Sequence, residues 1–107
     1  MDLPLSPQVF DLLVALSHGP QHGYALMQRI SDMHGGRYKP SPGVVYSNLQ
    51  RVVDWGWAEE APPPSSEEDA RRKHFRITAA GLEAARSHAA QEQARLKQAS
   101  SILGVLS

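Results

Sequence analysis

The chain of 107 residues has no cysteine, no long apolar run and no excess of charge of either sign. The lack of cysteine excludes disulfides, thiolate nucleophiles and thiolate metal sites. No apolar stretch is long enough to span a bilayer, and the first ten residues lack the basic start and apolar centre of a signal peptide. We therefore expect a cytoplasmic protein with no membrane partner. Lys and Arg together number 11, as do Asp and Glu, so an argument for nucleic-acid binding must rest on local charge.

Motifs of catalysis and metal binding are also missing. The five histidines form no HExxH pair, and the sequence has no Gly-x-Ser-x-Gly turn and no glycine-rich loop that would hold a phosphate. The sequence therefore predicts neither an enzyme nor a metal or cofactor site.

The first half of the chain predicts three short helices. A serine followed by a proline, at Ser6-Pro7 and again at Ser41-Pro42, is a helix start, because Ser caps free amides and Pro at the first position gives up an unpaired one. Apolar residues at helical spacing follow each start. We expect the first helix to end at Gly19-Pro20, the second to begin near Gln21, and the third to end at Gly56.

The second half predicts a hairpin and one long helix. Residues 57–60 and 73–77 read as two short strands, and the proline-rich and acidic segment 62–69 between them should be an exposed, mobile loop. From Thr78 onward the residues are strong helix formers, with Thr78 as the cap. We expect a mainly α (α+β) winged helix-turn-helix fold, with a DNA-binding domain at 1–77 and a C-terminal dimerisation helix at 78–107.

The long helix carries apolar residues that step by three and four, with Glu92 as the interruption. This seam consists of Leu82, Ala85, Ala89, Leu96, Ala99, Leu103 and Leu106. The helix could fold back on the core of its own chain. We favour pairing with a second copy, because a helix this long cannot bury the whole seam on a small domain.

The third helix has an apolar side and a polar side. Val45, Leu49, Val52 and Val53 should face the core, whereas the remaining surface should carry Tyr46, Ser47, Asn48, Gln50 and Arg51. Arg pairs with guanine, Gln or Asn pairs with adenine, and hydroxyls reach phosphates. A solvated outer face would look the same by composition, so the order of the elements is what favours a DNA-reading helix.

Three motifs in order resemble the PadR family of winged-helix transcriptional regulators. They are the segment from Leu16 through His22-Gly23-Tyr24-Ala25-Leu26, the segment from Ser41-Pro42-Gly43 through Tyr46 and Leu49 to Gly56, and the junction Phe75-Arg76-Ile77-Thr78-Ala79-Ala80-Gly81. The similarity covers nearly the whole chain. Val52, Val53 and Trp55 depart from the residues that are more usual in this family.

The resemblance implies a homodimer that binds an inverted-repeat operator, usually as a repressor, with release by a small molecule in some members. Carried over by position, the residues that would face DNA are Tyr24, Ser41, Gly43, Tyr46, Ser47 and Gln50, and the wing would add Arg71, Arg72 and Lys73. Arg51 on the third helix, together with Arg37 and Lys39 before it, completes the predicted set.

Three alternatives stay open at this point. The acidic residues 67–69 could neutralise the basic wing residues that follow them. Trp55 and Trp57 could contact a ligand, although we favour core positions for both. The whole fold could also serve as a winged-helix module that binds a protein partner and no operator.

Overall fold

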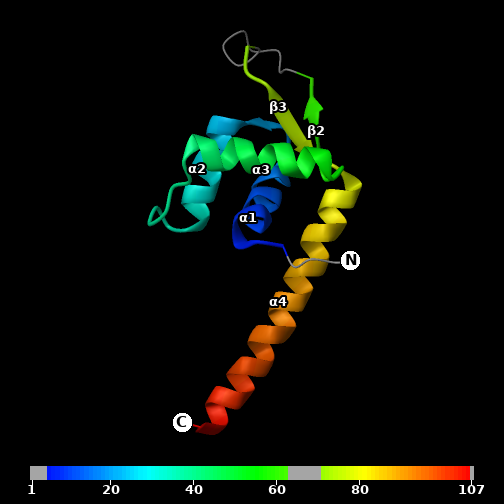
Figure 1. Cartoon of the computed structure of the whole chain (residues 1–107). Helices are drawn as coiled ribbons and strands as arrows, with labels where there is room; N and C mark the ends of the chain where they lie inside the picture. Colours follow the sequence, from blue (N-terminus) through cyan, green and yellow to red (C-terminus); the bar gives the residue numbers. More distant parts are fainter. Residues whose placement is uncertain (1–4, 63–70, 107) are drawn as a thin grey trace.

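The computed structural model describes residues 5–62 and 71–106, and it contains four helices and a small sheet (Figure 1). In chain order the elements are α1 (Pro7–Leu16), β1 (Gln21–His22), α2 (Gly23–Met33), α3 (Pro42–Asp54), β2 (Ala58–Ala61), β3 (His74–Ile77) and α4 (Ala79–Leu106). The predicted loop at 62–69 lies almost entirely outside the described residues.

Helices α1 to α3 pack around one apolar core. The core is built from leucines of α1 and from the inward faces of α2 and α3, and it includes Leu12, Leu13, Leu16, Leu26, Leu49 and Val52. The predicted caps are confirmed: the Ser6 hydroxyl accepts from the Val9 amide at 3.1 Å, and Ser41 accepts from Val44 at 3.3 Å. Gly56 ends α3 with a φ of 78°, a left-handed conformation that glycine adopts without strain.

The sheet has three strands where the sequence predicted two. β1 pairs with β3 through Gln21 opposite Phe75 and His22 opposite His74, which gives the order β1-β3-β2. The second helix therefore starts at Gly23, two residues later than expected. Its cap is His22, whose Nδ1 accepts from the Ala25 amide at 3.1 Å. Histidine is not among the favoured capping residues, so capping preference could not predict this start.

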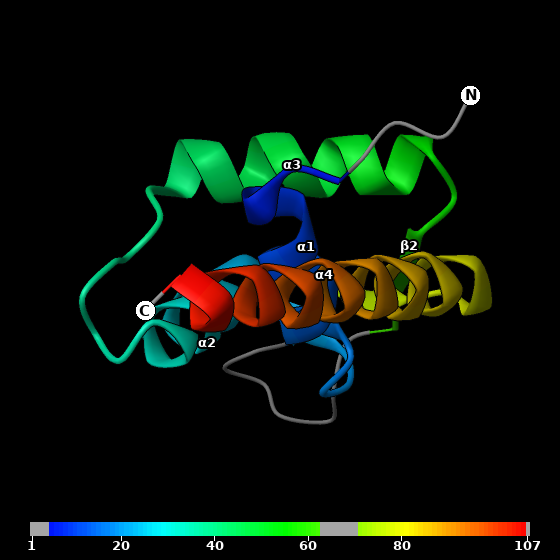
Figure 2. The same ribbon diagram turned by 90° about the horizontal axis from the view of Figure 1, so that it is seen from below.

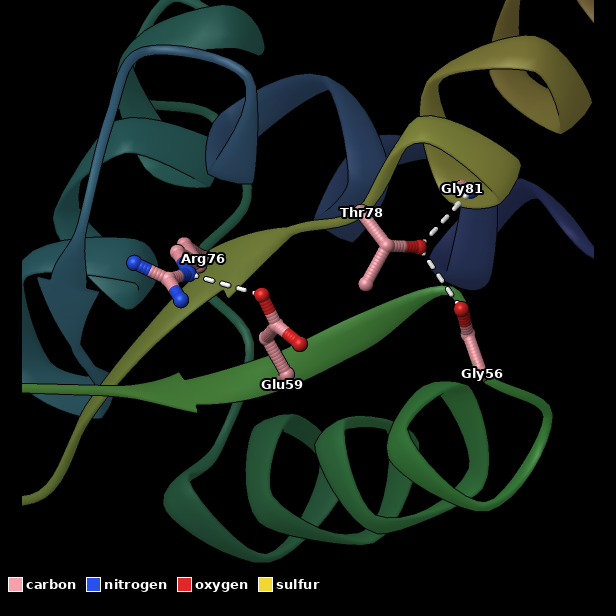
Figure 3. Close-up of polar contacts among 5 residues, drawn as sticks. All are labelled: Gly56, Glu59, Arg76, Thr78 and Gly81. Atoms are coloured by element: carbon pink, nitrogen blue, oxygen red, sulfur yellow. Dashed lines mark hydrogen bonds and ion pairs between the residues drawn. The ribbon is translucent and has the colours of Figure 1, made fainter.

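The start of α4 is fixed to the end of α3 through Thr78. Its hydroxyl accepts from the Gly81 amide at 3.1 Å, as the predicted cap should, and donates to the Gly56 carbonyl at 2.6 Å (Figure 3). A Cβ on Gly81 would overlap the carbonyl oxygen of Trp57. These contacts set the direction in which α4 leaves the domain.

Helix α4 packs on its own domain only along its first half. Its first half lies against α1, where Ala85 joins the core and the His88 ring lies 4.8 Å from the Phe10 ring. Seen from below, α4 runs across the front of the domain (Figure 2). The second half extends away from the other elements (Figure 1), and Leu96 and Leu103 are 58% and 64% exposed. Of the predicted seam residues in the first half of the helix, Ala85 is buried, Leu82 is half-buried and Ala89 is exposed. Folding back therefore accounts fully only for Ala85, which is corrected from a dimerisation residue to a core residue.

Glu92, which interrupts the apolar seam, is paired with a basic residue of the same helix. Arg95 donates to both carboxylate oxygens of Glu92, at 3.3 and 2.7 Å, and this hydrogen bonding lowers the pKa of the Glu92 carboxyl below its ordinary value. The side chain of Leu106, the last predicted seam residue, lies outside the described residues.

Candidate nucleic-acid interface

Helix α3 presents a polar outer face. Tyr46 is 54% exposed, and Ser47, Gln50 and Arg51 are exposed as well, whereas Val45 and Leu49 are buried on the opposite side. Gly43 near the start of the helix is also exposed, and a Cβ there would meet no atom within 4 Å. The helix start is therefore open to a large ligand.

One expected member of this face is buried. Asn48 is only 7% exposed and lines a cavity of about 10 Å³ between α1 and α3, together with Asp11 and Tyr38. It follows Val45 by three positions and precedes Val52 by four, so all three share one side of the helix. The prediction that Asn48 lies on the outer face was wrong. Its spacing from Val45 and Val52 already indicates a buried position.

Tyr46 rests on the start of α2. A Cβ on Gly23 would lie 2.7 Å from both Cζ and the hydroxyl of Tyr46, so the two helices approach this closely only because Gly23 has no side chain. Gly23 is part of the sequence motif at the start of the second helix, but its role depends on the packing of α2 against Tyr46, which the sequence alone does not show. This contact positions a tyrosine on the outer face of α3.

Tyr24 brings basic residues from distant parts of the chain together. The Lys39 ammonium lies 5.6 Å from the centre of its ring, and the Arg72 guanidinium carbon lies 5.9 Å from the same centre. Lys39 comes from the segment before α3 and Arg72 from the residues before β3. Cations within about 6 Å of an aromatic face are attracted to it. Tyr24, itself more than half exposed, thus gathers two of the predicted DNA-binding cations beside α3.

His22 adds a further polar group to this cluster. Its Nδ1 accepts the helix-capping bond from the Ala25 amide, and its Nε2 lies 3.4 Å from Nη1 of Arg72. The imidazole and the guanidinium therefore meet beside the Tyr24 ring. The His22 ring also stacks at 6.5 Å from Tyr24. His22 was not among the predicted site residues.

The other predicted basic residues of the loop before α3 and of the wing are exposed. Arg71 and Lys73 flank Arg72 and are exposed, and Arg37 is exposed in the segment between α2 and α3. Arg76 on β3 is neutralised by Glu59 on β2 at 2.8 Å (Figure 3). The basic part of the described wing is therefore confined to residues 71–73. The acidic residues 67–69, which could balance it, lie outside the described residues.

The two tryptophans at the end of α3 have different environments. Their rings meet edge to face, with centres 5.0 Å apart. Trp57 packs against the core, as favoured, whereas Trp55 is more than half exposed, so its expected core position was wrong. Trp55 is the C-terminal cap residue of α3, and its ring contacts the Trp57 ring instead of packing in the core.

Within residues 5–62 and 71–106, no three His, Cys, Asp or Glu side chains are grouped so that they could hold a metal ion. None of the helices described there is both long and apolar enough to cross a membrane.

Comparison with known proteins links this arrangement to one family. The model of the transcriptional regulator PadR-like family matches residues 12–87. The transcriptional regulator YqjI of Escherichia coli is 32% identical over 72 residues, which are 67% of this chain and 32% of that protein. The chain therefore spans about a third of the length of this curated relative.

Solved structures of transcriptional regulators share this fold. A PadR family transcriptional regulator from Eggerthella lenta superimposes with a TM-score of 0.72 at 25% identity, covering 89% of this chain and 80% of that one. A transcriptional regulator from Clostridium thermocellum gives a TM-score of 0.73 at 19% identity, covering 88% and 87%. These matches confirm the predicted fold class, a mainly helical winged helix with a long C-terminal helix.

Proposed function

The chain belongs to the PadR-like family of transcriptional regulators, and on this premise we propose that it is a homodimeric repressor that binds an inverted-repeat operator. Its family and its curated relative are regulators and not enzymes, in agreement with the sequence prediction. The observation that carries the proposal is the outer face of α3 beside the basic cluster of His22, Tyr24, Lys39 and Arg72.

In this proposal α3 enters the major groove and the cluster holds the flanking backbone. The amides at the start of α3 and the open space at Gly43 suit the close approach of a phosphate, because helix amino termini attract anions. Tyr46, Ser47, Gln50 and Arg51 then face base edges or phosphates, and Lys39 and Arg72 neutralise the strand on either side. Phosphate contacts fix the register, and base contacts select the sequence.

Dimerisation is assigned to the second half of α4. Leu96, Ile102 and Leu103 are each more than half exposed on a helix segment that leaves its own domain. Apolar side chains gathered in this way mark an interaction surface. A second copy of α4 would cover them together with the predicted seam residues Leu82, Ala89 and Ala99. The resulting two-fold axis sets two α3 helices about one DNA turn apart, roughly 34 to 36 Å, or at a multiple of that spacing.

A small-molecule effector would bind outside the domain core. The cavity between α1 and α3 holds about 10 Å³, which is at most the space of one water. An effector site would therefore lie on the surface or between protomers. The rival function, docking of a protein partner, is favoured by one observation, the exposed ring of Trp55 at the end of α3.

The test of the proposed function is selection of duplexes from a random DNA library by the purified protein, followed by sequencing. We expect enrichment of an inverted repeat whose half-site spacing corresponds to one or two helical turns. Folded protein that enriches no sequence at low salt would contradict operator binding. Enrichment of a single half-site would contradict the homodimer.

A further inference from the structure

The last turn of α3 carries an acidic residue on the face that should meet DNA. Asp54 is exposed and is the final residue of the helix. The carboxyl end of a helix carries partial negative charge, which disfavours a carboxylate there. The same carboxylate would repel DNA phosphates. A residue that is unfavourable on both counts indicates a functional role, because proteins break such local rules mainly at their sites.

Asp54 is hydrogen-bonded to the residue one turn before it. The Gln50 amide nitrogen donates to Oδ1 of Asp54 at 2.8 Å. A carboxylate only accepts hydrogen bonds, so the Gln50 side chain must turn its nitrogen toward Asp54 and its carbonyl oxygen elsewhere. The contact therefore fixes the orientation of the exposed Gln50 amide group. It uses one of the two amide protons and leaves one donor and the carbonyl acceptor for another partner.

We propose that Asp54 is a positioning residue that orients Gln50 to read an adenine in the major groove. Adenine presents an acceptor at N7 and a donor at its 6-amino group, which match one amide N–H and one amide C=O. Guanine presents two acceptors, so the same oriented amide would place oxygen against oxygen. The negative charge of Asp54 lowers affinity for every sequence, and the orientation raises discrimination. This inference rests on the proposed function, because it requires α3 to lie in the groove.

The simpler interpretation is that Gln50 and Asp54 are an ordinary pair one helical turn apart, of the kind that stabilises isolated helices slightly. That interpretation gives Asp54 no effect on sequence choice. The two interpretations differ in selectivity and not in overall affinity, because removing a negative charge strengthens DNA binding in both.

The experiment compares the wild type with three variants in the same random-duplex selection, with affinities measured on the enriched duplex and on its single-base substitutions. Asp54→Ala removes the acceptor and the charge. Asp54→Asn removes the charge but keeps an acceptor for the Gln50 amide. Gln50→Ala removes the amide itself. Thermal unfolding of each variant checks that α3 is intact.

We expect the wild type to prefer adenine at one position of each half-site by about tenfold or more. Asp54→Ala should reduce this preference by about three- to tenfold, the worth of one hydrogen bond, while binding all duplexes more tightly. Gln50→Ala should lose the preference at the same position, and Asp54→Asn should retain it.

The outcomes separate the inference from the function on which it rests. If the wild type enriches an operator and Asp54→Ala only tightens binding to all sequences equally, the positioning role is wrong and the proposed function stands. A preference lost equally in Asp54→Asn and Asp54→Ala would also overturn the positioning role, because charge alone would then set the choice. If the wild type enriches nothing, both fall.

Discussion

At the scale of single residues, two glycines allow the close contacts on which the interface depends. Gly23 lets the Tyr46 ring lie on the start of α2, and Gly81 lets the first turn of α4 lie on the backbone of Trp57. Neither residue has the left-handed φ for which glycine is usually required, as Gly56 does. Their role is the absence of a side chain where another part of the chain comes close.

Gly23→Ala should weaken operator binding with little loss of stability. The new Cβ would force the Tyr46 ring to move, whereas alanine itself favours the helix. We expect affinity for the selected duplex to fall by about tenfold, since each protomer loses roughly one hydrogen bond to DNA. Fluorescence anisotropy measures the affinity, and thermal unfolding measures the stability. Gly104→Ala is the matched control, because a Cβ there meets nothing within 4 Å. Unchanged affinity in Gly23→Ala would show that the position of Tyr46 does not matter.

Thr78→Val should destabilise the protein by about 1 to 2 kcal/mol, because it removes the cap on Gly81 and the hydrogen bond to the Gly56 carbonyl. Valine keeps the branched shape of threonine. Thr78→Ser keeps the hydroxyl and is the control, with an expected loss well below that of valine. Urea unfolding gives both free energies, and a loss in Thr78→Ser with none in Thr78→Val would mean that the methyl group and not the hydroxyl matters.

At the scale of elements, the sequence predicted the helix ends that are set by capping serines, prolines and glycine. The starts of α1 and α3 follow from Ser6 and Ser41, each next to a proline, and the end of α3 follows from Gly56. Strand β1 was missed because a two-residue strand has no periodicity, and its pairing with β3 joins residues more than 50 positions apart. The basic cluster around Tyr24 was missed as a unit for the same reason, although Tyr24, Lys39 and Arg72 were each predicted singly.

For α4, a charge on the exposed seam should separate the protomers. Leu96→Asp combined with Leu103→Asp places two carboxylates where a second copy should pack, so we expect a monomer at micromolar concentration and loss of tight binding to the inverted repeat. Sedimentation velocity measures the mass. Val105→Asp is the control, since Val105 is 83% exposed and lies half a turn away from Leu96 around the helix. A double variant that remains dimeric would contradict the assigned seam.

For the wing, replacement of Arg71 and Arg72 by Ala should weaken binding to all duplexes alike. If both residues contact phosphate in each of two protomers, the slope of log affinity against log salt should become shallower by about 3 to 4. Anisotropy titrations over a range of salt measure the slope on the operator and on an unrelated duplex. Loss confined to one sequence would show that these arginines read bases.

At the scale of the whole molecule, a neutral chain still presents one basic region. Positive and negative residues balance in number, but Lys39 and Arg72 both lie within 6 Å of the Tyr24 ring centre, and Arg71 and Lys73 are exposed next to Arg72. DNA binding requires a positive face and not a positive total. The order of elements allowed the fold class to be predicted. The direction of α4 could not be, because it depends on the contacts of Thr78 and Gly81 with the end of α3.

In the proposed function, α3 and the Tyr24 cluster bind DNA while the far half of α4 holds the dimer. The most direct test is amide hydrogen exchange of the protein alone and with the selected duplex. We predict slow exchange in α4 beyond Glu92 without DNA, and added protection on DNA binding at the starts of α2 and α3 and at residues 71–76. Protection by DNA that appears only in α4 would contradict DNA binding by α3, and fast exchange of the far half of α4 in the free protein would contradict dimerisation there.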